Sequence, residues 1–211
     1  SNGGVIVDAG TSDWSATNRY PCLSKPRTEY SGMVLHETFG NFAFAIAARV
    51  LGLRDLGPAL SPFNAFLILT GIETLGLRMQ RHSENALKVA EYLAAHPKVE
   101  WVSYPGLASD RYHALAKQYL PKGAGAVFTF GLKGGYEAGV KLVSNVELFS
   151  HLANIGDTRS LIIHPASTTH RQLTDEAKVV AGAGPEVVRL SVGIEDVADI
   201  IGDLEQALAK V

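Results

Sequence analysis

A long helical segment constrains the fold of this sequence more than any other feature. Ser61-Pro62 is a typical helix start, because a serine hydroxyl can cap free amide groups and a proline in the first turn has no amide proton to leave unpaired. From there a helical pattern runs to Ala95 and stops at His96-Pro97. Such a length suits one extended helix or two in succession, so we predict that residues 61–97 connect two domains.

The stretch before this segment starts like a strand and continues as a loop. Val5–Val7 is apolar and β-branched, which predicts a buried strand, and because no polar leader precedes it we expect further sequence upstream. Ala9–Met33 is rich in Ser, Thr, Pro, Asn and Gly without a regular period, which predicts a long ordered loop. His36–Leu53 is apolar at helical spacing and predicts a helix ending near Gly52 or Gly57.

The stretch after this segment mixes strands and helices. Its short connections favour some antiparallel pairing, and its last segment has an apolar and an acidic face, as in a surface helix over a sheet. We predict strands at Val99–Tyr104, Ala126–Leu132, Leu148–Ile155, Leu161–Ile163 and Val187–Val192, and helices at Tyr136–Val143 and Val197–Lys210.

The composition argues against several classes of function. With 46% hydrophobic and 19% charged residues, the chain has the balance of a globular protein with a real core. Its net charge of -2 comes from scattered residues, so we expect no binding to nucleic acid or to an anionic membrane. The most apolar segment, Phe63–Leu77, is too short to span a membrane. The single Cys22 cannot form an internal disulfide, which fits a reducing compartment and predicts a cytoplasmic location.

Residue spacing alone supports neither a nucleotide site nor a metal site. The glycines around Gly123 and Gly134 do not form a dinucleotide fingerprint, and no phosphate loop ends in Lys-Ser or Lys-Thr. His36 lacks the second histidine of a helical zinc site, and His164 and His170 stand six residues apart across a proline. We therefore expect these histidines to pack or hydrogen-bond locally, and we predict no metal site.

An arginine within an apolar strand pattern is the strongest candidate binding residue. Arg189 lies in the middle of Val187–Val192, where a guanidinium is costly unless it is paired. Its planar fork suits bidentate binding of a carboxylate. An internal ion pair with Asp157, Glu186 or Glu195 explains the arginine equally well, so the residues alone leave both interpretations open.

Two further polar stretches follow predicted strands. Asn154 lies near the end of the Leu148–Ile155 pattern, before a turn that contains Gly156. The stretch Ser167–His170 follows the strand Leu161–Ile163, and taken alone it suits a turn or a cap.

Long runs in order along the chain resemble a known family, the O-acetylhomoserine sulfhydrylases among the pyridoxal-phosphate enzymes of cysteine and methionine metabolism. The last two runs also resemble the wider group, such as cystathionine γ-synthase. The resemblance covers essentially the whole chain. The runs are Val34–Phe44, Leu60–Phe66, Gly71–Leu75, Arg78–Ala86, Ser103–Leu107, Leu161–His170 and Val188–Glu195.

This resemblance implies an α/β fold of type I, the aspartate aminotransferase-like fold. Residues 1–60 are then expected to be the end of the large cofactor-binding domain with an active-site loop, and residues 61–97 the connecting helix. Residues 98–211 are expected to form the C-terminal α+β domain that binds the substrate carboxylate.

The resemblance also implies roles for single residues. Arg189 matches the family arginine that holds the substrate α-carboxylate, which favours ligand binding over an internal ion pair. Asn154, where relatives often carry serine, matches a position near the cofactor lysine and the carboxylate. Thr169 and His170 match the family stretch Ser-Thr-Thr-His and are expected to support the site without reacting.

The activity implied is a γ-replacement that makes homocysteine and acetate from O-acetyl-L-homoserine and sulfide or a thiol, with pyridoxal 5'-phosphate as cofactor, in a homo-oligomer that is usually a tetramer. In the family, the Schiff-base lysine precedes the segment that matches Ser1–Gly4. We therefore expect no catalytic residue in this chain, and no activity without the missing N-terminal half. The alternatives are a cystathionine γ-synthase or lyase, against which the loop before Met33 and the run His36–Phe44 argue, and a non-catalytic interaction fragment.

Overall fold

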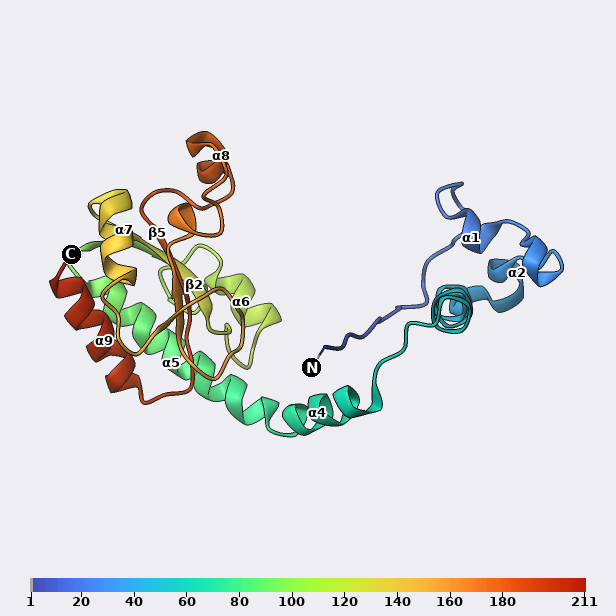
Figure 1. Cartoon of the computed structure of the whole chain (residues 1–211), viewed down its shortest axis with the longest axis horizontal. Coiled ribbons are helices and arrows are strands. Elements are labelled where there is room, and N and C mark those ends of the chain that lie inside the picture. The colour runs from blue at the N-terminus through green and yellow to red at the C-terminus, as the bar shows by residue number, and fades with distance from the viewer. Residues whose placement is uncertain (1) are drawn as a thin grey trace. The chain divides into compact units, whose positions relative to one another are not determined.

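The chain divides into two compact units, the residues up to Glu73 and the residues from Thr74 onward (Figure 1). The structure is a computed structural model and describes residues 2–211. A small apolar cluster organises the first unit, and a much larger one lies against the sheet of the second. The division into domains at residues 1–60, 61–97 and 98–211 stays a prediction.

The first unit consists of short helices around its small apolar cluster. Trp14 covers this cluster by stacking on Phe44, with ring centroids 5.7 Å apart. The buried residues are Leu23, Leu35, Ala43 and Ala47. The elements are α1 (Pro21–Ser24), η1 (Thr28–Tyr30), α2 (Leu35–Phe39), η2 (Gly40–Phe42), α3 (Ala43–Ala47), the π-helical η3 (Ala48–Leu56) and α4 (Pro62–Glu73).

The prediction of a strand at Val5–Val7 is wrong. These residues form no regular element, and they are 86%, 69% and 86% exposed in order. A strand needs a neighbour that satisfies its backbone groups, and among residues 2–211 no strand pairs with this segment. An apolar, β-branched composition therefore does not produce a strand here.

The helix predicted over His36–Leu53 is a succession of short helical segments. Gly40 has a φ of 52°, a conformation that glycine adopts without steric cost, and it separates α2 from the helical residues that follow. The succession ends at Gly57, whose φ of 84° is left-handed, which confirms one of the two predicted ends. The loop predicted over Ala9–Met33 is confirmed, apart from the short α1 and η1.

The connecting segment contains two helices in succession. α4 ends at Glu73 and α5 (Leu75–Ala95) begins after Thr74, whose φ of -102° and ψ of 4° lie outside the helical region. No residue of α4 is buried, whereas α5 buries one face that includes Val89 and Leu93. The predicted end of the helical pattern before His96 is confirmed.

The second unit is a five-stranded sheet with helices against it. The strand order is β1-β2-β5-β4-β3, and every pair is antiparallel except β3 with β4, which confirms the predicted antiparallel pairing. After α5, the elements are β1 (Val99–Ser103), α6 (His113–Tyr119), β2 (Val127–Leu132), α7 (Gly135–Val143), β3 (Ser150–His151), β4 (Leu161–Ile163), η4 (Pro165–Ser167), α8 (Asp175–Val180), β5 (Val187–Ser191) and α9 (Val197–Ala209).

Alternation of side chains along the strands gives this sheet its apolar face. Phe130 of β2 and Val188 and Leu190 of β5 are fully buried in the main cluster. Helices α5, α7 and α9, gathered on one side of the strands in Figure 1, contribute residues such as Leu142 and Leu204 to the same cluster. The central strand β5 therefore has one face in the core, and its alternate residues point to the other face.

The strand predicted over Leu148–Ile155 is mostly wrong, because β3 covers only Ser150 and His151. The amides of Leu148 and Phe149 donate to the carboxylate of Asp203 at 2.9 and 3.2 Å, so they are not available to a strand neighbour. The remaining residues up to Ser160 form a loop. Helices α6 and α8 were not predicted.

The core of the sheet gives a test of this architecture. Replacing Phe130 with alanine removes a fully buried ring, so we expect the free energy of unfolding to fall by about 3–5 kcal/mol. Tyr119→Ala, at a side chain that is 70% exposed, should change it by no more than about 0.5 kcal/mol. Urea denaturation of both variants measures the difference, and equal losses would contradict the assignment of the core.

Candidate functional site

Arg189 occupies the middle of the central strand. Its backbone lies between Thr129 of β2 and Ile163 of β4, and its neighbours Val188 and Leu190 point into the core. Strand alternation therefore places Arg189 on the opposite face of the sheet, where it is half-buried. The strand fixes the base of the side chain, and the guanidinium projects from that face.

The guanidinium of Arg189 has no carboxylate partner among residues 2–211. Its Nη2 donates to the backbone carbonyl of Asn154 at 3.3 Å. Of the three acids considered as internal partners, Asp157 pairs with Arg159 at 3.5 Å and Glu195 binds Ser160. Glu186 forms no ion pair with Arg189 within this described part of the chain. A guanidinium held by one neutral carbonyl keeps several donors for an anionic ligand.

Asn154 contacts Arg189 through its backbone carbonyl and not through its side chain. It lies in the loop after β3, and its exposed side-chain Oδ1 accepts a hydrogen bond from the amide of Ile155 at 2.9 Å. The amide group of the side chain is therefore at the surface near the guanidinium, where it can turn toward a ligand. The sequence prediction that these two residues share a site is compatible with this geometry and stays a prediction.

Thr169 and His170 form a separate local pair. The Thr169 hydroxyl and His170 Nδ1 are 2.9 Å apart. Within residues 2–211, no hydrogen bond or ion pair joins either residue to Arg189 or Asn154. In the described part of the chain, no direct contact with Arg189 or Asn154 therefore supports the role proposed for Thr169 and His170.

The histidine that begins this stretch anchors it from inside. His164 is fully buried, with Nδ1 at 2.9 Å from the Ser167 hydroxyl and Nε2 at 2.8 Å from the Pro185 carbonyl. Its backbone carbonyl accepts a hydrogen bond from the Thr168 hydroxyl at 2.8 Å. Burial lowers the pKa of His164, against a smaller opposing effect of the Pro185 carbonyl. The expected local role of this histidine is confirmed.

Sequence reasoning missed the contacts that hold the loop of Asn154. The Glu195 carboxylate accepts hydrogen bonds from the amide of Ser160 at 2.6 Å and from its hydroxyl at 2.9 Å. The hydroxyl of Ser160 also accepts from the amide of Gly193 at 2.8 Å. The Val-Gly-Ile-Glu sequence was visible, but Ser160 is 35 residues away from Glu195, so no local pattern shows the contact.

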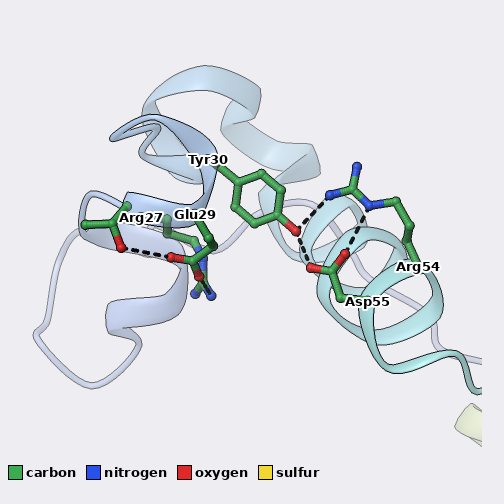
Figure 2. Close-up of polar contacts among 6 residues, drawn as sticks. Arg27, Glu29, Tyr30, Arg54 and Asp55 are labelled. Atoms are coloured by element: carbon green, nitrogen blue, oxygen red, sulfur yellow. Dashed lines mark hydrogen bonds and ion pairs between the residues drawn. The ribbon is translucent and has the colours of Figure 1, made fainter.

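A second polar cluster lies in the first unit (Figure 2). The Tyr30 hydroxyl donates to Asp55 and accepts from Arg54 Nη2 at 2.9 Å, while Arg54 Nε pairs with Asp55 at 3.0 Å. The hydrogen bond from Tyr30 lowers the pKa of Asp55 and, in return, raises the pKa of Tyr30. The cluster is exposed and fastens η1 to the end of η3, so its evident role is to hold the loop that precedes α2.

One cavity of the second unit lies away from these residues. A cavity of about 950 Å³ lies between α5 and α6 and is lined by residues such as Met79, Leu87 and Leu120. None of the four predicted site residues lines it. Its lining is mostly apolar and includes the charged residues Glu84, Lys117 and Lys122, and because none of the predicted site residues is among them we do not assign the chemistry to it.

A metal-binding group of side chains and a membrane-spanning helix are both absent from the described residues, 2–211. No group of three or more His, Cys, Asp or Glu side chains in that range is arranged to hold a metal ion. No helix in the same range combines the length and the apolar character that a membrane crossing requires.

Comparison with known proteins gives the class. The model of the Cys/Met metabolism PLP-dependent enzyme family matches residues 2–209. The chain therefore belongs to this family of pyridoxal-phosphate-dependent enzymes, as its sequence runs predict.

Individual relatives are sulfhydrylases and homocysteine synthases. The chain is 53% identical to O-acetyl-L-homoserine sulfhydrylase of Leptospira meyeri, over 100% of this chain and 50% of the relative. It is also 53% identical to homocysteine synthase of Schizosaccharomyces pombe, over 98% of this chain and 48% of the relative. The chain thus spans about half the length of the curated relatives it matches.

A solved structure confirms the fold class. The chain is similar to an O-acetylhomoserine (thiol)-lyase described from Campylobacter jejuni, with a TM-score of 0.83 and 43% identity over 92% of this chain and 46% of that one. That structure carries a pyridoxyl-lysine phosphate group. The mixed α/β architecture expected for part of a type I fold is confirmed.

The buried histidine gives a pH-dependent prediction. Because the pKa of His164 is lower in the folded protein than its usual 6.5, the unfolded chain takes up a proton first as the pH falls. The stabilising contribution is complete above about pH 6.5 and is lost as the pH falls through the folded pKa. We expect His164→Gln to weaken the fall in unfolding free energy between about pH 8 and about pH 5. Chemical denaturation across that range checks this, with His113→Gln as control because His113 is not among the groups that shift the pKa of His164, and an unchanged slope in His164→Gln would contradict it.

Proposed function

We propose that the full-length protein is a pyridoxal-phosphate-dependent sulfhydrylase that makes homocysteine and acetate from O-acetyl-L-homoserine and sulfide. The observation that carries the proposal is the likeness to O-acetylhomoserine sulfhydrylases along the whole chain. The shorter loops that the family resemblance associates with cystathionine enzymes do not match this chain's ordered segment before Met33. In this reaction the acetate at Cγ is replaced by sulfur.

The residues of this chain bind and orient the substrate in the proposed reaction. Arg189 binds the α-carboxylate through two parallel N–H donors, because the strand fixes the base of its side chain and the guanidinium has no acidic partner within residues 2–211. The side-chain amide of Asn154 contributes a further donor beside it. Thr169 and His170 shape the neighbouring surface without reacting.

The cofactor, when bound, supplies an electron sink for carbanion chemistry. The donors around Arg189 fit a carboxylate, and they include no cationic partner or cradle of amides for a phosphate among residues 2–211. We therefore propose that the cofactor contacts come from the part of the protein that corresponds to the other half of the relatives. The chain contributes the carboxylate-binding face.

Replacing Arg189 tests the assignment of substrate binding. Arg189→Met in the full-length protein removes both donors and the charge, which should cost about 2–5 kcal/mol in kcat/KM for O-acetylhomoserine. Arg111→Met, at an exposed arginine of the same unit, should behave as the unchanged protein. Steady-state assays with sulfide measure both. The same assay with cysteine as the thiol separates the sulfhydrylase from a cystathionine synthase, and full activity in Arg189→Met would refute the role.

No lysine of this chain is proposed as the attachment point of the cofactor. Lys98 and Lys133 donate to the carbonyls of Leu208 and Pro97, each at 2.7 Å. Lys178 pairs with Asp175 at 3.0 Å, which occupies it as well.

Because the cofactor contacts are proposed to lie in the part of the protein that corresponds to the other half of the relatives, the isolated 211-residue chain should neither turn over nor show the visible absorption of a lysine-bound cofactor. Absorbance spectroscopy with added pyridoxal phosphate, before and after borohydride, measures this directly. A visible band in the isolated chain that borohydride abolishes would show that one of its own lysines holds the cofactor.

The remaining partners and the location are also proposals. We infer a homo-oligomer, of the tetrameric kind expected for the family, that acts on small molecules in the cytoplasm. Exposed apolar side chains support association: along α4, Phe63, Phe66 and Leu69 are all more than 60% exposed. Neither nucleic acid nor membrane is expected as a partner, because the charges are scattered.

A further inference from the structure

The carboxylate of Glu195 in the second unit is bound by two neutral donors. Both oxygens of Glu195 accept from Ser160, one from the backbone amide at 2.6 Å and one from the hydroxyl at 2.9 Å. Ser160 is fully buried, and it is the last residue before β4. Such a two-point contact with a charged acceptor fixes both the position and the orientation of the serine.

The glycine between β5 and Glu195 is what allows this contact. A Cβ at Gly193 would lie 2.2 Å from Glu195 Oε2 and 2.5 Å from the amide nitrogen of Ser160. The glycine amide also donates to the Ser160 hydroxyl at 2.8 Å, and the amide of Ile194 donates to the Thr158 carbonyl at 2.9 Å. The segment after β5 and the residues before β4 are therefore joined by four hydrogen bonds within a space that admits no side chain at Gly193.

Helix α5 also holds the segment that follows β5. Asn85, which is buried, donates from Nδ2 to the carbonyls of Gly193 and Glu195 at 3.1 and 2.9 Å. Buried His82 has its Nδ1 at 2.6 Å from the carbonyl of Val192. The backbone that carries Glu195 is thus fixed from the helix, and the carboxylate transmits that position to Ser160.

We propose that Glu195 is a positioning residue for the carboxylate-binding group: it holds the loop 152–160 so that the Asn154 carbonyl aims the Arg189 guanidinium. The loop starts at the end of β3 and ends at Ser160, and its contact with Arg189 is the 3.3 Å hydrogen bond at Asn154. An arginine side chain has many rotamers, so a fixed carbonyl removes conformations that do not face the ligand. The inference rests on the proposed function, because it deepens the role given to Arg189.

The distinguishing readout is the preference for a ligand that has a carboxylate. L-Norvaline and butylamine have the same carbon chain and amino group, and only norvaline has the carboxylate that Arg189 would bind. In the full-length protein with its cofactor, we expect Glu195→Ala to weaken binding of norvaline on the order of 10-fold and to leave binding of butylamine unchanged. Glu195→Gln keeps one acceptor for the Ser160 amide, so its loss should be smaller than that of Glu195→Ala.

Asp203 provides a matched control. Its carboxylate also accepts backbone amides, from Glu147 and Leu148 at 2.8 and 2.9 Å, and it is 8% exposed, but it holds the segment before β3. Asp203→Ala should lower stability without changing the ratio of the two affinities. Calorimetric titration of both ligands and thermal unfolding are measured on all variants.

The outcomes separate the two proposals. If the unchanged protein does not convert O-acetylhomoserine, the proposed function fails whatever Glu195→Ala does. If the unchanged protein is active and Glu195→Ala binds both ligands as before, or loses both equally, the positioning role is overturned while the function stands. A ratio changed as much by Asp203→Ala as by Glu195→Ala would overturn it as well, because the effect would then be general destabilisation.

Discussion

The position of Arg189 in the central strand of the sheet is the constraint on which the proposed binding face of this unit depends. A cation at such a position is costly, and the strand tolerates it because alternation turns it away from the core formed by Val188 and Leu190. The strand on each side supplies a backbone neighbour, Thr129 or Ile163, but no charge. Arg189 thus places a positive charge on one face of the sheet, and the strand fixes the base of its side chain.

One face of the sheet is packed against helices, and the other face carries the proposed carboxylate-binding group. On the covered face, α5, α7 and α9 bury apolar residues from every strand except the short β3. The other face carries Arg189 beside buried apolar residues such as Val187 and Ile163, and the 152–160 loop lies next to the arginine. Helix α5 belongs to both, because Val89 and Leu93 pack in the core while Asn85 binds the backbone that follows β5. A helix fixed by the core can therefore hold the backbone near the binding face.

Residue periodicity was enough to predict the elements whose formation depends on residues close together in the sequence. The strands β1, β2, β4 and β5 and helices α7 and α9 follow from periodicity, and Arg189 stood out because a charge interrupts such a period. The same reasoning failed at Val5–Val7, where no strand among residues 2–211 pairs with the segment, and at Leu148–Ile155, where Asp203 binds the amides of Leu148 and Phe149. The contact of Glu195 with Ser160 joins residues far apart in sequence, and no periodicity reports it. The family resemblance supplied the proposed role of Arg189, which the residues alone left open.

Glu195 is one of the acids considered as an internal partner of Arg189, and its carboxylate is bound by Ser160 instead. Had this carboxylate paired with Arg189, an anionic ligand would have to displace an internal charge before it could bind. Instead, each oxygen of Glu195 accepts one hydrogen bond from Ser160, a neutral residue, and the missing Cβ of Gly193 makes room for that contact. Asp157 is turned aside in a similar way by Arg159 and by the amide of that same residue. The acids that could neutralise the arginine are thus used to shape the loop beside it, which leaves the guanidinium available for a carboxylate.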